Sequence, residues 1–163
     1  MSTATSSESG SPEADEPRWL TADQQRVWRA YLLGSARLSE RLDADLRKFG
    51  MDLPEYEILV SLEETPGRRL RMSELANAVH QSRSRLTHTI SRMEKAGLVV
   101  RTTSPTDRRG VWAELTEAGI ELLATAAPSH VACVQKNFVD AIGEQDYAAL
   151  GRAFNAVLNV DAD

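Results

Sequence analysis

The sequence predicts a mainly α-helical chain that carries a single small β-hairpin. Apolar residues recur at steps of three and four over long stretches near both ends of the chain, as on one side of an α-helix. Capping and turn residues separate these stretches. In between, two stretches of strand-forming residues, Leu98–Thr102 and Val111–Leu115, flank the turn-forming segment 104–110 and predict the hairpin.

The first 18 residues are expected to form a disordered acidic tail. Residues 1–17 are rich in Ser, Thr, Glu, Ala and Pro, and they contain four acids and no base. A segment of this kind lacks the apolar content that an ordered core needs. We therefore place the folded domain at residues 19–163.

The folded domain is expected to begin with a long helix and a shorter one. Thr21 and Gln24 match the capping-box pattern that begins a helix. The apolar period that follows continues to Gly50, which ends this helix. Pro54 suits the first turn of the second helix, which stops before the turn dipeptide Pro66-Gly67.

A succession of short elements follows. Arg69–Arg71 alternates as a minimal strand, and Ser73 is expected to cap a brief helix. A tight turn at His80-Gln81 leads to a second helix at Ser82–Ala96, and Gly97 behind it predicts a left-handed C-terminal cap. Two helices joined by a tight turn and followed by a β-hairpin are typical of a winged helix-turn-helix.

We place the winged helix-turn-helix at residues 54–116 and a pair of dimerisation regions on either side of it, at about 19–50 and 117–160. Pro128 and Gly143 are expected to kink or interrupt the C-terminal region. The terminal helices carry more apolar residues than the central module could cover. We expect them to pack together and onto a second subunit as a homodimer.

Charge is segregated along the chain. The net charge is −5, but residues 67–109 hold ten basic and three acidic residues, a balance of +7 that leaves −12 for the rest. Phosphate contacts depend on the local field, so this balance points to double-stranded DNA as the partner. A solvated basic face without a partner is the alternative.

Composition excludes several other classes. No apolar run is long enough to span a bilayer, and no basic flank precedes an apolar stretch at the N-terminus. We therefore expect a cytoplasmic protein without a membrane partner. Cys133 is the only cysteine, which excludes an internal disulfide, and we expect it to be an inert packing residue.

One side of the helix at Ser82–Ala96 has the composition of a DNA-reading surface. Its exposed residues include arginines, short hydroxyls and an imidazole but no acid, and arginine can chelate the N7 and O6 atoms of guanine. For Arg85 or Arg92 taken singly, a salt bridge with Glu94 or Asp107 is an even alternative. We expect DNA contacts from Ser82, Arg83, Ser84, Arg85, Thr87, His88, Arg92, Arg108 and Arg109.

Three blocks of this sequence resemble the MarR family of bacterial transcriptional regulators. They are Ser82-x-x-x-Leu86-Thr87-His88-x-Ile90-x-Arg92-Met93-Glu94-Lys95-x-Gly97-Leu98-Val99, then Asp107-x-Arg109, then Leu115-Thr116-x-x-Gly119. The resemblance implies a dimer that binds a pseudo-palindromic operator through a winged helix-turn-helix. It further implies that Arg109 enters the minor groove with Asp107 as its support, and that Ser84, Thr87 and His88 contact the major groove. His88 departs from the arginine that is common in the family at that position.

The resemblance also implies a repressor that releases DNA when a small aromatic or phenolic effector binds. Trp28, Tyr31 and Tyr56 are the candidate pocket residues, and packing in the core is the alternative for each of them.

Nothing in the sequence supports catalysis. It contains no nucleophile turn, no glycine-rich phosphate loop and no His-x-x-x-His pair backed by a glutamate. We expect no enzyme activity, no cofactor and no metal. Two alternatives stay open: a winged-helix module that binds another protein, and a DNA-binding regulator with no small-molecule ligand.

Overall fold

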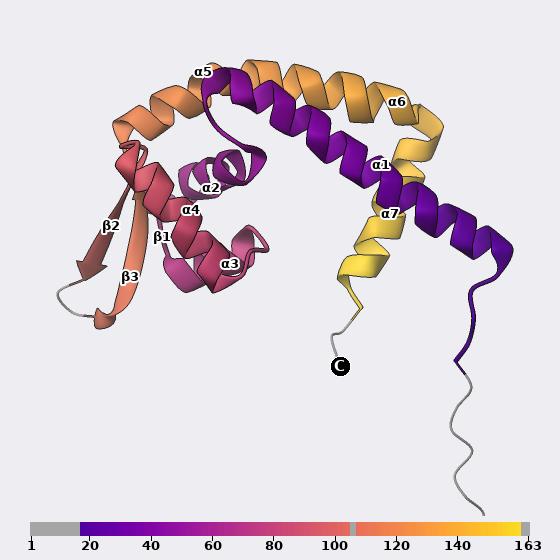
Figure 1. The fold of residues 1–163 in the computed structure, drawn as a ribbon, viewed down its shortest axis with the longest axis horizontal. Coiled ribbons are helices and arrows are strands. Elements are labelled where there is room, and N and C mark those ends of the chain that lie inside the picture. The colour runs from indigo at the N-terminus through magenta and orange to yellow at the C-terminus, as the bar shows by residue number, and fades with distance from the viewer. Residues whose placement is uncertain (1–16, 105–106, 161–163) are drawn as a thin grey trace, which may run out of the picture. The chain divides into compact units, whose positions relative to one another are not determined.

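The computed structural model describes residues 17–104 and 107–160 (Figure 1). At residue 104 and at residues 107–109 of the hairpin, it describes the backbone but not the side chains. The predicted tail at residues 1–18 therefore lies almost wholly outside the described residues. The chain forms two compact units, one that ends at Gly34 and one that begins at Ser35. None of the helices in the described part combines the length and the apolar character that a bilayer crossing requires.

The first unit contains the beginning of helix α1 (Ala22–Leu46). The predicted capping box is present, since the Thr21 hydroxyl accepts from the Gln24 amide at 3.2 Å and the Gln24 side chain accepts from the Thr21 amide at 2.9 Å. The rings of Trp28 and Tyr31 stack with their centroids 5.5 Å apart. Helix α1 continues into the second unit and ends through a 3-10 turn at Gly50, whose φ of 78° is the left-handed conformation expected there.

The second unit is a helical domain with a small antiparallel sheet (Figure 1). The strands lie in the order β1-β3-β2. The mainly α-helical fold with a β-hairpin wing is thus confirmed. Its further elements are α2 (Leu53–Glu63), β1 (Arg69–Arg71), α3 (Met72–Ala78), α4 (Arg83–Lys95), β2 (Val99–Ser104), β3 (Asp107–Leu115), α5 (Glu117–Val134), α6 (Asp140–Ile142) and α7 (Glu144–Leu158).

Helix α2 lies at the centre of the core and packs against α3, α4, α5 and the sheet. Burial of an aliphatic side chain of this size contributes about 1.5–3 kcal/mol, so this core supplies most of the favourable free energy of folding. The large side chains that are fully buried are Leu46, Ile58, Leu59, Leu62, Leu75, Leu86, Ile90, Met93 and Val99.

Both ends of α4 are capped, and the cap at Gly97 is the one that the sequence predicts. The Ser82 hydroxyl accepts from the Arg85 amide at 3.2 Å. At the other end, Gly97 has a φ of 76°, its amide donates to the Glu94 carbonyl at 3.0 Å, and the next amide donates to the Met93 carbonyl at 3.0 Å. These two bonds form a Schellman cap, which fixes where the helix stops and the wing begins.

Helix α5 is anchored to the beginning of β2. Its N-cap Thr116 accepts from the Gly119 amide at 3.1 Å and donates to the Gly97 carbonyl at 2.6 Å. A Cβ at Gly119 would overlap the Leu98 carbonyl oxygen and would lie 2.7 Å from Leu115 Cδ1. Only glycine allows this close packing of helix and strand.

A buried carboxylate ties α1 to α5 within the second unit. Asp45 accepts from the Ser129 hydroxyl at 3.0 and 3.1 Å and from Lys48 Nζ at 2.5 Å. The hydrogen bond from Lys48 is the main reason that the pKa of Asp45 lies below its ordinary value.

One local prediction was wrong. Ser73 does not cap α3, because the helix begins two residues earlier than predicted, with Arg71 at the N-cap and its amide donating to Glu74 at 3.3 Å. Of the kink or interruption expected at Pro128, the interruption does not occur, because α5 continues through this residue. Pro128 and Ala124, whose carbonyl loses its helical donor, are both exposed, so water can satisfy that carbonyl. The regular helix instead gives way to a π-helical segment at Gln135–Val139, and Gly143 separates α6 from α7.

Candidate nucleic-acid interface

Helix α4 buries one side and exposes the other, as its sequence pattern predicts. Leu86, Thr89, Ile90 and Met93 are buried. The opposite side, which we call the α4 face, consists of Ser82, Arg83, Ser84, Arg85, Thr87 and His88, all of which are exposed. The α4 face contains no acid.

The hydrogen bonds of the α4 face divide its residues into two groups. The Ser82 hydroxyl accepts the N-cap bond, and the Thr87 hydroxyl donates to the Arg83 carbonyl at 2.8 Å. Among the described residues, the side chains of Arg83, Ser84, Arg85 and His88 make no hydrogen bond or ion pair. These four side chains are available to a ligand without loss of an internal bond.

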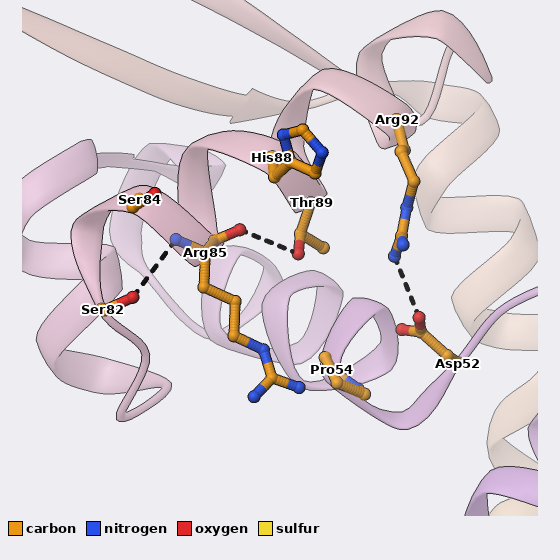
Figure 2. A pocket seen from close by; sticks show the side chains of 8 residues that line it. All are labelled: Asp52, Pro54, Ser82, Ser84, Arg85, His88, Thr89 and Arg92. Carbon is orange, nitrogen blue, oxygen red and sulfur yellow. Dashed lines mark hydrogen bonds and ion pairs between the residues drawn. The ribbon is translucent and has the colours of Figure 1, made fainter.

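A shallow hollow of about 440 Å³ lies beside the α4 face, between α4 and the N-terminal end of α2 (Figure 2). Figure 2 shows His88 projecting from α4 and the Arg85 side chain extending towards Pro54. The hollow is lined by Asp52, Pro54, Ser82, Ser84, Arg85, His88, Thr89 and Arg92.

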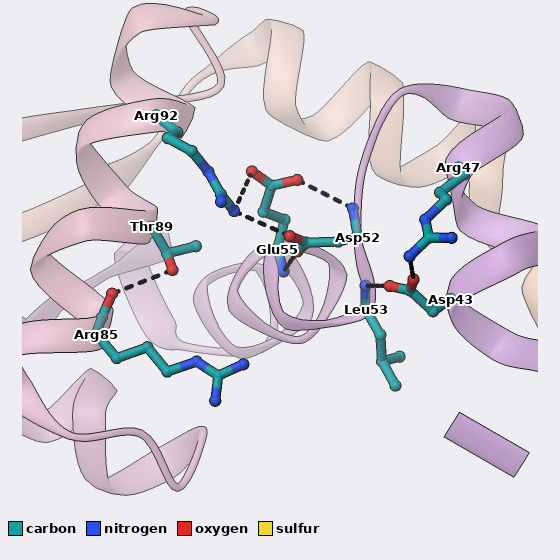
Figure 3. A network of polar contacts seen from close by, with 8 residues as sticks. All are labelled: Asp43, Arg47, Asp52, Leu53, Glu55, Arg85, Thr89 and Arg92. Atoms are coloured by element: carbon teal, nitrogen blue, oxygen red, sulfur yellow. Dashed lines mark hydrogen bonds and ion pairs between the residues drawn. The ribbon is translucent and has the colours of Figure 1, made fainter. Parts of the chain in front are cut away.

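Arg92, one helical turn beyond His88, extends towards the start of α2 and holds two carboxylates there (Figure 3). Its Nη2 lies 2.9 Å from Asp52 Oδ2 and 3.1 Å from Glu55 Oε1. The same two acids form the capping box of α2. The negative charge of Glu55 is the main reason that the pKa of Arg92 is raised. Arg92 therefore braces α4 against α2.

Glu94, one of the two salt-bridge partners considered for Arg92, has another partner. Glu94 Oε2 accepts from Arg101 Nη2 at 2.7 Å, which joins α4 to β2. The hydrogen bonds from Arg101 hold the pKa of Glu94 below its ordinary value. Two ion-pair systems thus position α4, one towards α2 and one towards the wing. No local pattern signals the first, because Asp52 and Glu55 lie 40 and 37 residues before Arg92.

The wing is present as an antiparallel hairpin of β2 and β3, with Thr103 opposite Val111. The side chains of Asp107, Arg108 and Arg109 lie outside the described residues, so the minor-groove role of Arg109 and the support from Asp107 stay predictions. Towards the base of the hairpin, the guanidinium groups of Arg69 and Arg71 each lie 5.3 Å from the centroid of the Trp112 ring system. This cluster was not predicted from the sequence.

The candidate pocket residues belong to different units. Trp28 and Tyr31 lie in the first unit, where they stack on each other. Tyr56 lies in the second, where its ring is 4.3 Å from that of His130 between centroids. These two rings line a cavity of about 640 Å³ together with Leu38, Ser39, Leu42, Leu53, Glu57, Val60, Ser61, Ala78, Val79 and His80.

Burial shapes the chemistry of this cavity. It lowers the pKa of His130 and raises the pKa of Tyr56, because it disfavours the charged form of each. The Nδ1 atom of His130 is buried and has no hydrogen-bond partner among the described residues. The lining of the cavity therefore includes two aromatic side chains whose charged forms are disfavoured by burial.

No metal-binding cluster of histidine, cysteine and carboxylate side chains occurs within the described part of the chain. Cys133 is half-buried in α5, and its thiol donates to the Arg41 carbonyl with a separation of 3.8 Å.

Comparison with known proteins decides the family. The family model for MarR matches residues 49–110. The chain is 45% identical to AbsC, a MarR family transcriptional regulator from Streptomyces coelicolor, over 87% of this chain and 96% of that one, with a TM-score of 0.82. This chain belongs to the MarR family. A second MarR regulator of that organism, Sco3205, was solved in complex with DNA; it is 43% identical over 89% of this chain and 91% of its own, with a TM-score of 0.84.

Less similar relatives of this chain are also transcriptional regulators. MhqR of Bacillus subtilis (strain 168) is 25% identical over 67% of this chain and 73% of its own length. The transcriptional repressor MprA of Escherichia coli (strain K12) is 30% identical over 62% of this chain and 57% of its own length. The family resemblance expected from the three sequence blocks is thus confirmed.

Proposed function

We propose that this MarR family member regulates transcription by binding double-stranded DNA of defined sequence as a homodimer. The observation that carries the proposal is the acid-free α4 face, which presents arginine, histidine and serine side chains that no internal partner occupies. The 43% identity to a regulator that was solved in complex with DNA supports it.

The α4 face has side chains for both kinds of DNA contact. Guanidinium groups of Arg83 and Arg85 can pair with phosphates or chelate guanine, while the short Ser84 side chain allows close approach to a base edge. His88 can donate or accept in the major groove. Arg92 is assigned to the brace and not to the phosphates, because two carboxylates already hold it.

The wing is proposed to place Arg109 in the minor groove, with Asp107 orienting it. A narrow minor groove concentrates negative potential and attracts an inserted arginine. Arg109→Ala should weaken operator binding substantially in a gel-shift titration at fixed salt while the dimer stays intact. Unchanged affinity would remove the wing from the mechanism.

Dimer formation is proposed to use the helical regions at about 19–50 and 117–160. Each unit exposes large apolar side chains there, such as Trp19 (84% exposed) in the first and Leu158 (74% exposed) in the second. Exposed apolar surface of this kind marks interaction sites. The dimer should place two α4 helices about 34 Å apart, one turn of the duplex. Footprinting that protects a single half-site, with a monomeric mass in solution, would contradict this geometry.

The proposed output is repression that a small aromatic or phenolic effector relieves. Two features support it: the cavity beside Tyr56 and His130, and the similarity to a transcriptional repressor. Trp28 and Tyr31 remain the other candidate pocket residues. A compound that binds in the cavity beside Tyr56 and His130 should raise the melting temperature of the protein. It should also cause the protein to release DNA in the same concentration range. Thermal stabilisation without release would separate the pocket from regulation.

Genome-wide selection of bound fragments tests the function directly. The protein should enrich duplexes that share a pseudo-palindromic site, and an effector screen on that site should follow. Failure to enrich any duplex, together with recovery of a protein partner through the α4 face, would instead indicate a protein-binding module.

A further inference from the structure

A second groove lies between α4 and the base of the wing, away from the hollow beside α2. It has a volume of about 440 Å³. Residues from the four elements β1, α3, α4 and β3 line it. Its polar atoms come from Arg71, Ser73, Arg83 and Thr87, and its side on the wing is formed by Gly110 and Val111. We call it the wing groove.

The described residues that line the wing groove carry positive charge. Among the described residues that line it, two are arginines and none is an acid. Within the described ranges, the Ser73 hydroxyl and the Arg83 guanidinium make no hydrogen bond or ion pair. Ser73 is free because α3 begins without its help. A groove of this composition is suited to an oxygen-rich anion such as a phosphodiester.

Arg71 is oriented by an aromatic support. Its guanidinium lies 5.3 Å from the Trp112 centroid, and β1–β3 pairing places the two residues directly opposite each other. Arginine stacked on a ring loses less conformational freedom when it binds an anion, because the side chain is already ordered. Arg69 lies at the same distance from the same ring but does not line the groove.

We propose that the wing groove holds the DNA phosphate backbone between the major groove, which α4 reads, and the minor groove, which the wing enters. A strand that separates these two grooves must pass between the two elements that occupy them. Arg71 is the principal charged contact and Trp112 is a positioning residue that acts through it. The inference rests on the proposed function and adds Arg71, Ser73 and Trp112 to the interface.

The experiment compares Arg71→Ala with the matched control Arg69→Ala. Affinity for a selected operator and for a scrambled duplex is measured by fluorescence anisotropy from 50 to 300 mM salt. Arg71→Ala should lower affinity about tenfold for both duplexes, and it should reduce the slope of log K against log salt by about 0.9 for each phosphate that the variant no longer neutralises. Arg69→Ala should leave affinity and slope unchanged.

Three further variants separate charge and orientation from folding. Arg71→Lys should keep the salt slope, because it keeps the charge. Arg83→Ala removes the second cation of the groove, and it does so at an exposed position of the helix. Trp112→Phe should retain more affinity than Trp112→Leu at equal slope, because an aromatic face remains under Arg71. Melting temperatures establish that each variant is folded.

The outcomes distinguish this inference from the proposed function. Wild-type protein that binds no duplex would overturn the function itself. If the wild-type protein binds duplex DNA but Arg71→Ala and Arg83→Ala do not change the salt slope, only the inference about the wing groove is overturned. An equal loss from Arg69→Ala and Arg71→Ala would also overturn it, because the loss would then follow the stack on Trp112 and not the groove.

Discussion

Replacing Arg92 by alanine should destabilise the protein without changing the salt dependence of DNA binding. Arg92 lies in the helix that is proposed to read DNA, and a basic residue there would ordinarily be assigned to a phosphate. Its guanidinium instead contacts Asp52 at 2.9 Å and Glu55 at 3.1 Å, and these acids begin α2. The substitution therefore removes an internal brace.

The size of the effect follows from exposure. The Arg92 side chain is 55% exposed, which limits the pair to the weak range of surface ion pairs, but the Glu55 side chain is only 14% exposed. We expect a loss of about 1 kcal/mol in the free energy of unfolding. For a protein of this size that loss corresponds to about 2–4 °C in melting temperature.

The assay combines thermal denaturation at fixed protomer concentration with anisotropy titrations over a salt series. Arg85→Ala is the matched control, because Arg85 makes no ion pair within the described residues and lies on the α4 face. It should leave the melting temperature unchanged and reduce the salt slope. Asp52→Asn, which keeps the Oδ1 acceptor of the α2 cap, should be non-additive with Arg92→Ala. A reduced slope with unchanged stability in Arg92→Ala would refute the brace.

Two other predictions concern stability. Gly119→Ala should lower the free energy of unfolding by several times the roughly 1 kcal/mol expected for Gly97→Ala. A Cβ at Gly119 overlaps a backbone oxygen, whereas a Cβ at Gly97 meets open space and only the positive φ opposes it. Chemical denaturation of both variants measures the difference, and equal losses would contradict the close packing at Gly119. Burial lowers the pKa of His130, so the unfolded state takes up this proton first as pH falls. The free energy of unfolding should therefore decrease as pH falls below about 7, from the ordinary histidine pKa down to the lowered pKa of His130. His130→Gln should flatten this decrease. Parallel curves of unfolding free energy against pH for the two proteins would contradict this role of His130.

The sequence predicted the elements that local chemistry determines. The caps at Thr21, Gly50 and Gly97 occur where expected, because each depends on residues within a few positions of the cap. The division of α4 into a buried and an exposed side was also predictable, since helical periodicity alone sets it.

The contacts that position the candidate site depend on tertiary structure and could not be predicted. The partners of Arg92 are distant in the sequence, and no local pattern connects them. The stack of Arg71 on Trp112 depends on the register of β1 against β3, which a three-residue strand does not determine by its own pattern. The cap predicted at Ser73 was misplaced because the local sequence does not show that α3 begins directly after β1.

The salt dependence of duplex binding tests most directly whether the α4 face binds DNA. Operator affinity should be measured by anisotropy at 50 and 200 mM salt. A dimer that makes six or more phosphate contacts should lose about a thousandfold or more in affinity over this range, and the selected site should bind more tightly than a scrambled one throughout. Affinity that is flat with salt, or equal for the two duplexes, would contradict sequence-specific DNA binding by the α4 face.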